Sequence, residues 1–440
     1  MNGTVGFWLA ADALGVFRAE RLAAGALRAL ARRRLGRVLE TAAGTYFYRQ
    51  RFAAAGVDPG SPLLRLDPEA VLSLLAPVGK AELRAAGVAV LAGGRVSPGW
   101  YSSSSSGSTG EPFRVYYASR AWATLKYLVK LRARSACGVG VADRVALLDA
   151  IPPIPGQGAA RRAGRVARIS VLQPGAAIAE QLASFAPDAV YGLPSALLEA
   201  AAALRERGAA VAVDRVFTSG ELLRPAVRDA ITEAFQARVF DVYGSSETKE
   251  IAWECPAGGM HVNADVVRLE VLDDEGRPLP DGVEGNLVAT SLVNHAMPLL
   301  RYRIGDRGSL RAHACACGRS SPLLGVVTGR AADVLVLSDG RRVSPYALTC
   351  ALEREESLLR YQVSQLDSAR LRVRAIVGPG TERDVVADRV RALLRSEVAS
   401  FLETDVEFVD HLPTGPRAKF RVVQPLAAPA ESPVCDWNSR

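Results

Sequence analysis

The stretch Tyr101-Ser-Ser-Ser-Ser-Ser-Gly-Ser-Thr-Gly-Glu-Pro112 places five consecutive serines before a Gly-Ser-Thr-Gly run. Glycines let backbone amides approach a ligand closely and the hydroxyl groups add donors, so the stretch suits a bound polyphosphate. A flexible Ser/Gly linker has a similar composition. The β-prone residues 88–91 before it and the strand-like Phe113-Arg-Val-Tyr-Tyr117 after it favour a ligand-binding loop. It is not a Walker A loop, because no Lys-Ser or Lys-Thr follows the glycines.

Outward from this loop, the hydrophobic pattern alternates between helix and strand. Helical periodicity is expected over residues 8–55, 119–136, 173–185, 194–207 and 225–234, and short apolar strands at residues 145–148, 189–191, 216–218 and 239–242. Short strands dominate residues 262–310, and a small α+β pattern follows residue 330. The alternation predicts an α/β fold whose sheets are covered by helices.

The composition describes an ordinary globular chain with an excess of positive charge. Its 440 residues allow two or three domains, and the net charge of +8 suits an anionic substrate such as a nucleotide. No basic run with interleaved aromatic residues indicates nucleic acid. Asp12, Arg18 and Glu20 interrupt the apolar N-terminus, so neither a membrane span nor a signal peptide is expected. Six cysteines in a chain of this length indicate a reducing, cytoplasmic setting rather than a disulfide framework.

Four further motifs follow the serine loop in order: Tyr243-Gly-Ser-Ser-Glu247, Tyr302-Arg-Ile-Gly-Asp306, Gly329-Arg-Ala-Ala-Asp333 and Lys419. The ordered set resembles the adenylate-forming superfamily, and within it the phenylacetate–coenzyme A ligase family and its capsular-polysaccharide-type relatives. That resemblance implies an ATP-dependent, AMP-forming ligase with magnesium as cofactor. Such an enzyme adenylates a carboxylic acid, here aryl or arylacetic, and transfers the acyl group to the thiol of coenzyme A.

Other outcomes stay open at this point. The acceptor could be a carrier-protein thiol or an amine, and the chain could be a non-catalytic nucleotide-binding descendant. Glu111 stands where the family usually has lysine, Ala332 where its hinge commonly has aspartate, and Ala418 where glycine precedes the lysine. Of these departures, Glu111 and Ala332 favour the non-catalytic alternative. Neither the acid nor the assembly follows from the sequence, and a homodimer is one option.

The resemblance assigns roles to individual residues. The β- and γ-phosphates of ATP are expected on Ser105, Ser106, Gly107, Ser108, Thr109 and Gly110. Tyr243 would stack on adenine beside Gly244 and the Ser246 hydroxyl, and Glu247 would bind magnesium. From the residues alone, Glu247 is more simply an acid at a helix N-terminus, and it is the other motifs beside it that favour the metal ligand. Tyr191-Gly-Leu-Pro-Ser195 and Thr218-Ser-Gly-Glu221, with Gly220 and Glu221, occupy places where relatives line the acid pocket and adenine site.

Three more residues complete the expected nucleotide site. Asp306 would accept hydrogen bonds from both ribose hydroxyls, although an aspartate in a turn after glycine is common without such a role. Arg330 would join it at the nucleotide. Lys419 resembles the catalytic lysine that contacts the α-phosphate and the substrate carboxylate, although it could belong to a solvated basic cluster with Arg417 and Arg421.

The motifs also suggest how the chain is divided. An adenylation domain is expected over residues 1–328 and a hinge over residues 329–333. A small C-terminal domain over residues 334–426 would hold the lysine, and a mobile tail is expected over residues 427–440.

A second constellation is Cys255-x5-His261 followed by Cys315-x-Cys317. Four sulfur and nitrogen ligands on two short segments suit tetrahedral zinc, and a closed set of four leaves no open position for catalysis. A structural zinc is therefore expected, and some relatives in the resembled family hold a comparable one. Free buried thiols are the alternative, and His313 could replace His261 as the fourth ligand.

Overall fold

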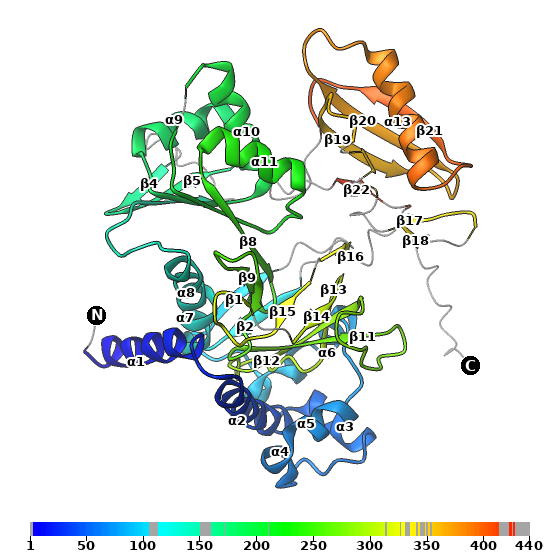
Figure 1. Cartoon of the computed structure of the whole chain (residues 1–440). Helices are drawn as coiled ribbons and strands as arrows, with labels where there is room; N and C mark the ends of the chain where they lie inside the picture. Colours follow the sequence, from blue (N-terminus) through cyan, green and yellow to red (C-terminus); the bar gives the residue numbers. More distant parts are fainter. Residues whose placement is uncertain are drawn as a thin grey trace, which may run out of the picture. The chain divides into compact units, whose positions relative to one another are not determined.

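The computed structural model describes residues 3–104, 113–149, 160–171, 173–209, 211–312, 315–325, 327–330, 335–339, 342–343, 348, 351–352, 354–412, 422–424 and 426. The chain forms two compact units, which divide between Val327 and Thr328 (Figure 1). The expected mixed α/β class is confirmed, with several sheets and covering helices.

Helices open the first unit, and the periodicity predicts those up to residue 54. They are α1 (Gly3–Ala19), α2 (Ala24–Ala43), α3 (Tyr46–Ala54), α4 (Leu63–Leu66), α5 (Pro68–Leu74) and α6 (Lys80–Ala86). On α2 the spacing of Leu35, Val38, Leu39 and Ala42 puts these apolar side chains on one buried face. The strand preference expected at residues 88–91 is wrong. A short 3-10 helix, η1 (Gly87–Val90), lies there, and its Gly87 has a φ of +53° that favours glycine.

The serine loop belongs to a β-hairpin. Strand β1 (Tyr101–Ser104) pairs antiparallel with β2 (Arg114–Tyr117), from Tyr101 opposite Tyr117 to Ser104 opposite Arg114. Residues 105–112 lie outside the described part of the chain. Because its two flanking strands pair with each other, the loop joins neighbouring strands rather than two domains. The expected helix 119–136 follows as α7 (Ser119–Ala123), the π-helical turn η3 (Thr124–Leu128) and α8 (Val129–Ala136).

A ten-stranded sheet forms the centre of the first unit, in the order β14-β15-β10-β9-β8-β7-β6-β3-β5-β4. Its strands are β3 (Val145–Asp149), β4 (Ala160–Ala163), β5 (Val166–Ser170), β6 (Ala189–Gly192), β7 (Arg215–Ser219), β8 (Arg238–Ser245), β9 (Lys249–Glu254), β10 (Met260–Val262), β14 (Leu310–Arg311) and β15 (Leu323–Leu324). The run β8-β7-β6-β3-β5 is parallel. Helices α9 (Gly175–Phe185), α10 (Pro194–Glu206) and α11 (Pro225–Phe235) share an apolar core with it.

A smaller antiparallel sheet contains β11 (Val267–Leu272), β12 (Gly285–Ser291) and β13 (Tyr302–Gly308). Val78 extends it beside β13: its amide donates to the carbonyl of Arg301 at 2.9 Å, and its carbonyl accepts from the amide of Arg303 at 2.9 Å. This pairing fixes the start of α6 next to β13.

The second unit contains the small α+β pattern. Its strands are β16 (Gly329–Arg330), β17 (Leu335–Val336), β18 (Arg342–Val343), β19 (Leu358–Gln365), β20 (Arg370–Val377), β21 (Glu403–Phe408) and β22 (Val423–Gln424). Four of them form a sheet in the order β21-β20-β19-β22. Helix α13 (Arg383–Glu397) buries Val386, Val390 and Leu394, whose spacing of four residues places them on one face.

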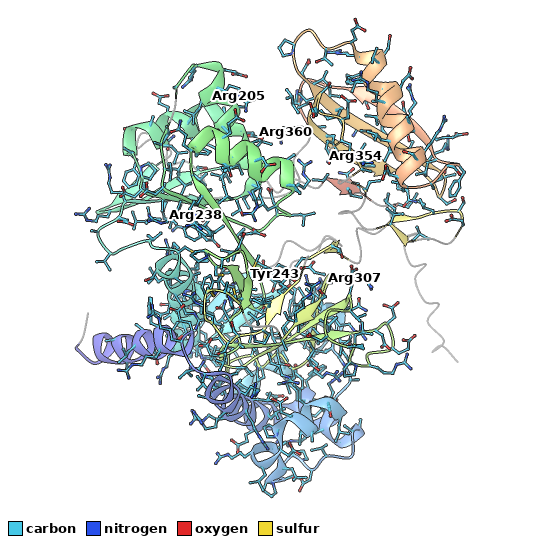
Figure 2. The ribbon with its side chains drawn as sticks, viewed as in Figure 1. Arg205, Arg238, Tyr243, Arg307, Arg354 and Arg360 are labelled. Atoms are coloured by element: carbon cyan, nitrogen blue, oxygen red, sulfur yellow. The ribbon has the colours of Figure 1, made fainter. Side chains whose placement is uncertain are left out.

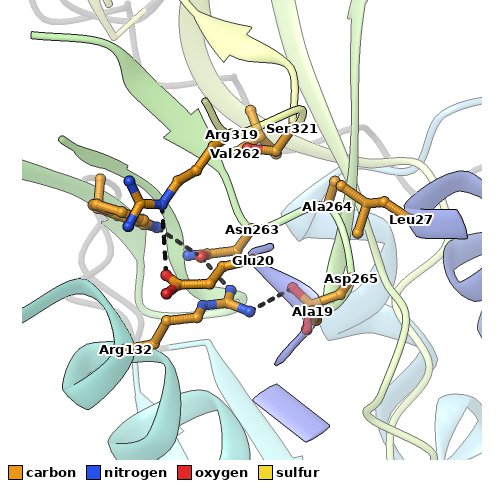
Figure 3. Close-up of a pocket in the computed structure, with 11 residues that line it drawn as sticks. Ala19, Glu20, Leu27, Arg132, Val262, Asn263, Ala264, Asp265, Arg319 and Ser321 are labelled. Atoms are coloured by element: carbon orange, nitrogen blue, oxygen red, sulfur yellow. Dashed lines mark hydrogen bonds and ion pairs between the residues drawn. The ribbon is translucent and has the colours of Figure 1, made fainter. Parts of the chain in front are cut away.

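A buried polar network joins three segments of the first unit (Figure 3). The guanidinium of Arg132 on α8 donates to Asp265 Oδ1 at 2.9 Å, to the Val16 carbonyl at 3.0 Å and to the Asn263 side chain. Arg132 and Asp265 are each only 2% exposed. The cavity beside them measures ≈ 10 Å³, room for about one water molecule, so this network is structural rather than a ligand site.

Candidate active site

Three neighbouring parallel strands, β6, β7 and β8, end at Gly192, Ser219 and Ser245. Ligands of open α/β sheets bind beyond the carboxyl ends of such strands. The motifs Tyr191-Gly-Leu-Pro-Ser195, Thr218-Ser-Gly-Glu221 and Tyr243-Gly-Ser-Ser-Glu247 all lie at this edge. The sheet topology therefore brings together three motifs that are far apart in sequence.

Glu221 holds the segment after β7 against the start of α10. Its carboxylate accepts hydrogen bonds from the amide and the hydroxyl of Ser195, each at 2.9 Å. Gly220, with a φ of +86°, makes the turn, and a Cβ there would lie 3.1 Å from Leu193 Cδ2. These contacts give Glu221 a positioning role at this edge.

The predicted adenine and ribose residues lie in direct contact. The Tyr243 hydroxyl on β8 donates to Asp306 Oδ2 on β13 at 2.7 Å, and Figure 2 labels Tyr243 on its strand. Both side chains are half-buried. An aromatic ring and a carboxylate from two different sheets thus lie together, as the predicted roles at adenine and ribose require.

The turn after Tyr243 is held tightly. Gly244 has no room for a side chain, because a Cβ would lie 2.5 Å from the carbonyl oxygen of Lys249. The Ser245 hydroxyl accepts hydrogen bonds from the amides of Glu247 and Thr248 at 3.2 and 3.0 Å. Lys249 closes the turn with a φ of +64°, a strained value for a residue with a side chain. The backbone around Glu247 is therefore preorganised.

Glu247 is 5% exposed, and its Oε1 atom has two partners. Lys80 Nζ lies 3.0 Å away and the Tyr302 hydroxyl donates at 3.0 Å. Burial alone would raise the pKa of Glu247, but the charge and hydrogen bond of Lys80 outweigh it and lower the pKa below its ordinary value. The side chain is therefore an ionised carboxylate at neutral pH, as a metal ligand must be.

Tyr117 connects the serine-loop hairpin to this turn. Its hydroxyl donates to the carbonyl oxygens of Ser246 at 3.1 Å and Glu247 at 2.6 Å. Burial, and then the charge of Glu247, raise the pKa of Tyr117 well above its ordinary value, so the hydroxyl keeps its proton. The Ser246 carbonyl also accepts from Lys249 Nζ at 2.7 Å.

The other predicted nucleotide residues are described only in part. Residues 105–112, with the six phosphate-loop residues, lie outside the described residues, as do Lys419, Ala332 and Asp333. The backbone of Arg330 lies in β16, and its side chain is not among those described. The roles expected for these residues remain predictions.

The second constellation comes together as predicted. One ligand atom from each of Cys255, His261, Cys315 and Cys317 lies within 4.8 Å of the others. The Cys255 and Cys315 sulfurs are 3.6 Å apart, and His261 Nε2 is 3.1 Å from Cys317 Sγ. Gly259 is required at this turn, because a Cβ would lie 2.8 Å from Cys315 Sγ. His313 lies outside the described residues.

The surroundings of this cluster suit a metal. Burial, and then the charge of Arg319, lower the pKa of His261 to about 4, so the imidazole is neutral. Its Nδ1 lies 3.0 Å from the Ser321 hydroxyl, which leaves Nε2 facing the thiols. Burial would raise the pKa of Cys317, but the amide and guanidinium of Arg319 outweigh it and lower the pKa, which favours the thiolate. The donor set fits tetrahedral zinc.

Sequence reasoning missed the residues that surround Glu247. Lys80 reaches it because Val78 pairs with the start of β13, a contact that no local pattern announces. Lys130 was not predicted from the sequence either. Its Nζ lies 3.0 Å from Glu250 Oε1 and 4.6 Å from the centre of the Tyr191 ring. The only available signal for Lys130 is its position on a helix that follows the serine loop.

The arrangement of sheets is that of the adenylate-forming CoA ligases. A solved structure of 2-hydroxyisobutyryl-CoA ligase, in the postadenylation state with its acyl-adenylate, matches with a TM-score of 0.78 at 20% identity, over 92% of this chain and 91% of that one. The expected fold is thus confirmed.

Sequence comparison finds relatives that are more similar in sequence than this solved structure. The phenylacetate–coenzyme A ligase of Thermus thermophilus is 31% identical over 289 residues, 61% of this chain and 64% of that protein. Protein CapK of Staphylococcus aureus is 24% identical over 208 residues, 47% of this chain and 45% of that protein. The chain thus spans less than two thirds of the length of either relative. No family model matches the chain. These similarities confirm the resemblance expected from the motifs.

Within the described residues, none of the helices combines the length and the apolar character that crossing a bilayer requires.

Proposed function

We propose that the chain is an AMP-forming acid–thiol ligase. The carboxylate of the acid attacks the α-phosphorus of ATP, pyrophosphate leaves, and an acyl-adenylate forms. The thiol of coenzyme A then attacks the acyl carbon and AMP leaves. The observation that carries this proposal is the contact of Tyr243 with Asp306 at 2.7 Å, because it joins the two residues expected at adenine and ribose at the edge where Glu247 also lies.

In this proposal each described residue has a physical task. Tyr243 presents its ring to adenine. Asp306 accepts hydrogen bonds from the ribose hydroxyls, and the hydrogen bond that it now accepts from the Tyr243 hydroxyl must rearrange when they bind. Glu221 and Ser195 hold the strand edge against which the acid lies. Aryl and arylacetic acids are the substrate class implied by the phenylacetate–coenzyme A ligase that the chain resembles.

Glu247 fits a magnesium ion by its chemistry. Mg²⁺ takes hard oxygen ligands and commonly binds through one or two carboxylates together with substrate phosphates. Glu247 is a buried, ionised carboxylate on a preorganised turn. Its Oε1 already accepts from Tyr302 and Lys80, so the carboxylate stays oriented while a cation binds. The ion would neutralise charge on the phosphates, and Lys419 would stabilise the charge that develops at the α-phosphate.

Cys255, His261, Cys315 and Cys317 would hold a structural zinc. Such an ion would fasten the β9–β10 hairpin to the segment between β14 and β15, from which Cys315 and Cys317 come. Because all four positions are filled by protein, the ion would stabilise the fold and would take no part in acyl activation.

The test is ATP–pyrophosphate exchange with a panel of carboxylic acids, followed by detection of the acyl product with coenzyme A, a carrier-protein thiol or an amine as acceptor. We expect exchange with at least one acid and thioester formation with coenzyme A. Exchange with transfer only to an amine would replace the acceptor, and absence of exchange with every acid would favour a non-catalytic nucleotide-binding protein.

A further inference from the structure

Two lysines lie beside the strand edge with no carboxylate within 4.0 Å among the residues that the structure describes. Lys126 belongs to the π-helical turn η3, and Lys249 follows the turn that holds Glu247. Their Nζ atoms lie 4.4 Å and 5.3 Å from the centre of the same ring, that of Trp122. Lys249 Nζ also lies 5.1 Å from the centre of the Tyr117 ring. The indole of Trp122 thus contacts two ammonium groups that come from two separate elements.

The acids around these lysines are already paired. Glu247 is held by Lys80 at 3.0 Å, and Glu250 by Lys130 at 3.0 Å. Asp149 is held by Arg168 at 2.6 Å. Within the described residues, neither Lys126 nor Lys249 has a carboxylate within 4.0 Å. Among the described residues, positive groups therefore outnumber carboxylates here by these two lysines, whose charges the paired acids offset only at longer range.

Placing the ammonium groups of Lys126 and Lys249 together in this way costs free energy unless they bind an anion. Burial, and then the charges of Arg168 and Lys130, lower the pKa of Lys126, so the surroundings destabilise the charged form of its ammonium group. A cation–π contact returns only about 0.5–2 kcal/mol. Trp122 is itself fixed, since Tyr101 stacks on it with ring centres 5.3 Å apart and planes 5° apart. π-Helical turns and left-handed non-glycine residues are both enriched at functional sites.

The lysines share the site already described. Tyr117 donates to the Glu247 carbonyl and its ring faces Lys249, so both lysines lie near the turn that holds the metal-ligand candidate. Resting on the proposed function, we infer that the acid activated here bears a second negatively charged group, which Lys126 and Lys249 bind while its other carboxylate is adenylated. The aromatic faces of Trp122 and Tyr117 would lie against the skeleton between the two groups.

The experiment uses acids that differ only in charge. A nitro group has the shape of a carboxylate without its charge, so 4-carboxyphenylacetate is compared with 4-nitrophenylacetate, and glutarate with 4-nitrobutyrate. ATP–pyrophosphate exchange gives kcat/KM for each acid with the wild type, Lys126→Met and Lys249→Met. Arg207→Met is the matched control, because it removes one exposed positive charge at the end of α10. Thermal melting establishes that each variant is folded.

We expect the wild type to prefer the dianion of a pair, and each lysine variant to lower that preference roughly tenfold or more, the usual effect of a lost charged hydrogen bond. Arg207→Met should keep it. A wild-type preference for the nitro acids, or an unchanged preference in both lysine variants, overturns the inference. A rise in the KM for ATP with unchanged acid preference also overturns it, since the lysines would then serve the nucleotide.

Direct binding separates this inference from the proposed function. Calorimetric titration of 4-carboxyphenylacetate and 4-nitrophenylacetate, with glutarate and 4-nitrobutyrate alongside, needs no turnover. If no acid supports exchange but a dianion binds and loses affinity in both lysine variants, the ligase proposal fails and the dianion site stands. If exchange occurs and the dianions gain nothing over their nitro partners, the ligase stands and the dianion site fails.

Discussion

The ion pair between Lys80 and Glu247 allows a prediction whose size follows from its geometry. The atoms Lys80 Nζ and Glu247 Oε1 are 3.0 Å apart, which corresponds to about 5 kcal/mol of Coulomb attraction at an effective dielectric constant of about 20. Part of this is offset by desolvation. The side chain of Lys80 is 32% exposed and that of Glu247 6%, so the pair lies between exposed pairs, worth about 0.2–1 kcal/mol, and fully buried ones, whose disruption costs about 3–5 kcal/mol.

We therefore expect Lys80→Met to destabilise the first unit by about 2 kcal/mol at pH 7, because the Glu247 carboxylate would lose its cation and keep the hydrogen bonds from the Tyr302 hydroxyl and from its own backbone amide. Urea denaturation of the wild type, Lys80→Met, Glu247→Gln and the double variant gives the coupling energy by a double-mutant cycle. Glu247→Gln keeps the acceptor oxygen for Tyr302 and removes only the charge. A coupling energy below about 0.3 kcal/mol, within the usual error of additivity, would refute the reasoning.

Four other changes have expected outcomes. Cys315→Ser should abolish bound zinc and lower the melting temperature, and less than about half an equivalent of zinc in the wild type would contradict the metal site. Arg132→Met should cost up to about 3–5 kcal/mol in denaturant unfolding, because it removes the ion pair at 2.9 Å from the 2%-exposed Asp265 carboxylate and leaves it Arg34 at 3.4 Å; a cost below about 1 kcal/mol would contradict this. Burial raises the pKa of Asp241 from 3.8 to about 6, so ionisation of this carboxyl destabilises the folded state as the pH rises through that range. Asp241→Asn should therefore stabilise the protein by at most about 3 kcal/mol above pH 6 and by nothing near pH 3.5. Thermal melts at both pH values would show this difference. Lys419→Ala should slow pyrophosphate exchange roughly 10²–10³-fold with the melting temperature unchanged, and exchange at the wild-type rate would exclude Lys419 as the catalytic lysine.

The parts of the fold that could be predicted from sequence are those with a strong local period. The helices of residues 3–54 and the alternation from β3 to β8 follow from hydrophobic spacing. Strands β4 and β5 were missed, because Arg161, Arg162, Arg165 and Arg168 interrupt any apolar run there. Residues 88–91 look strand-like by composition, yet they form a 3-10 turn because Gly87 reverses the chain.

The candidate site divides in a similar way. Tyr243, Glu247 and Asp306 could be predicted because each lies in a short motif with a glycine turn. Lys80, Lys126 and Lys249 could not be predicted as site residues, since what brings them there is a strand pairing at Val78, a π-helical turn and a left-handed backbone residue. Contacts of this kind depend on tertiary structure and leave no periodic trace in the sequence.

The two hydrogen bonds of Tyr117 have a mechanical consequence. Tyr117 closes the hairpin whose far end leads into the serine loop, and its hydroxyl grips the backbone of the Glu247 turn at two successive carbonyls. A displacement of the hairpin or of the Glu247 turn would thus be transmitted to the other segment through the protonated phenol of Tyr117. In the proposed ligase, a nucleotide that moved the hairpin would therefore also move the turn that holds Glu247.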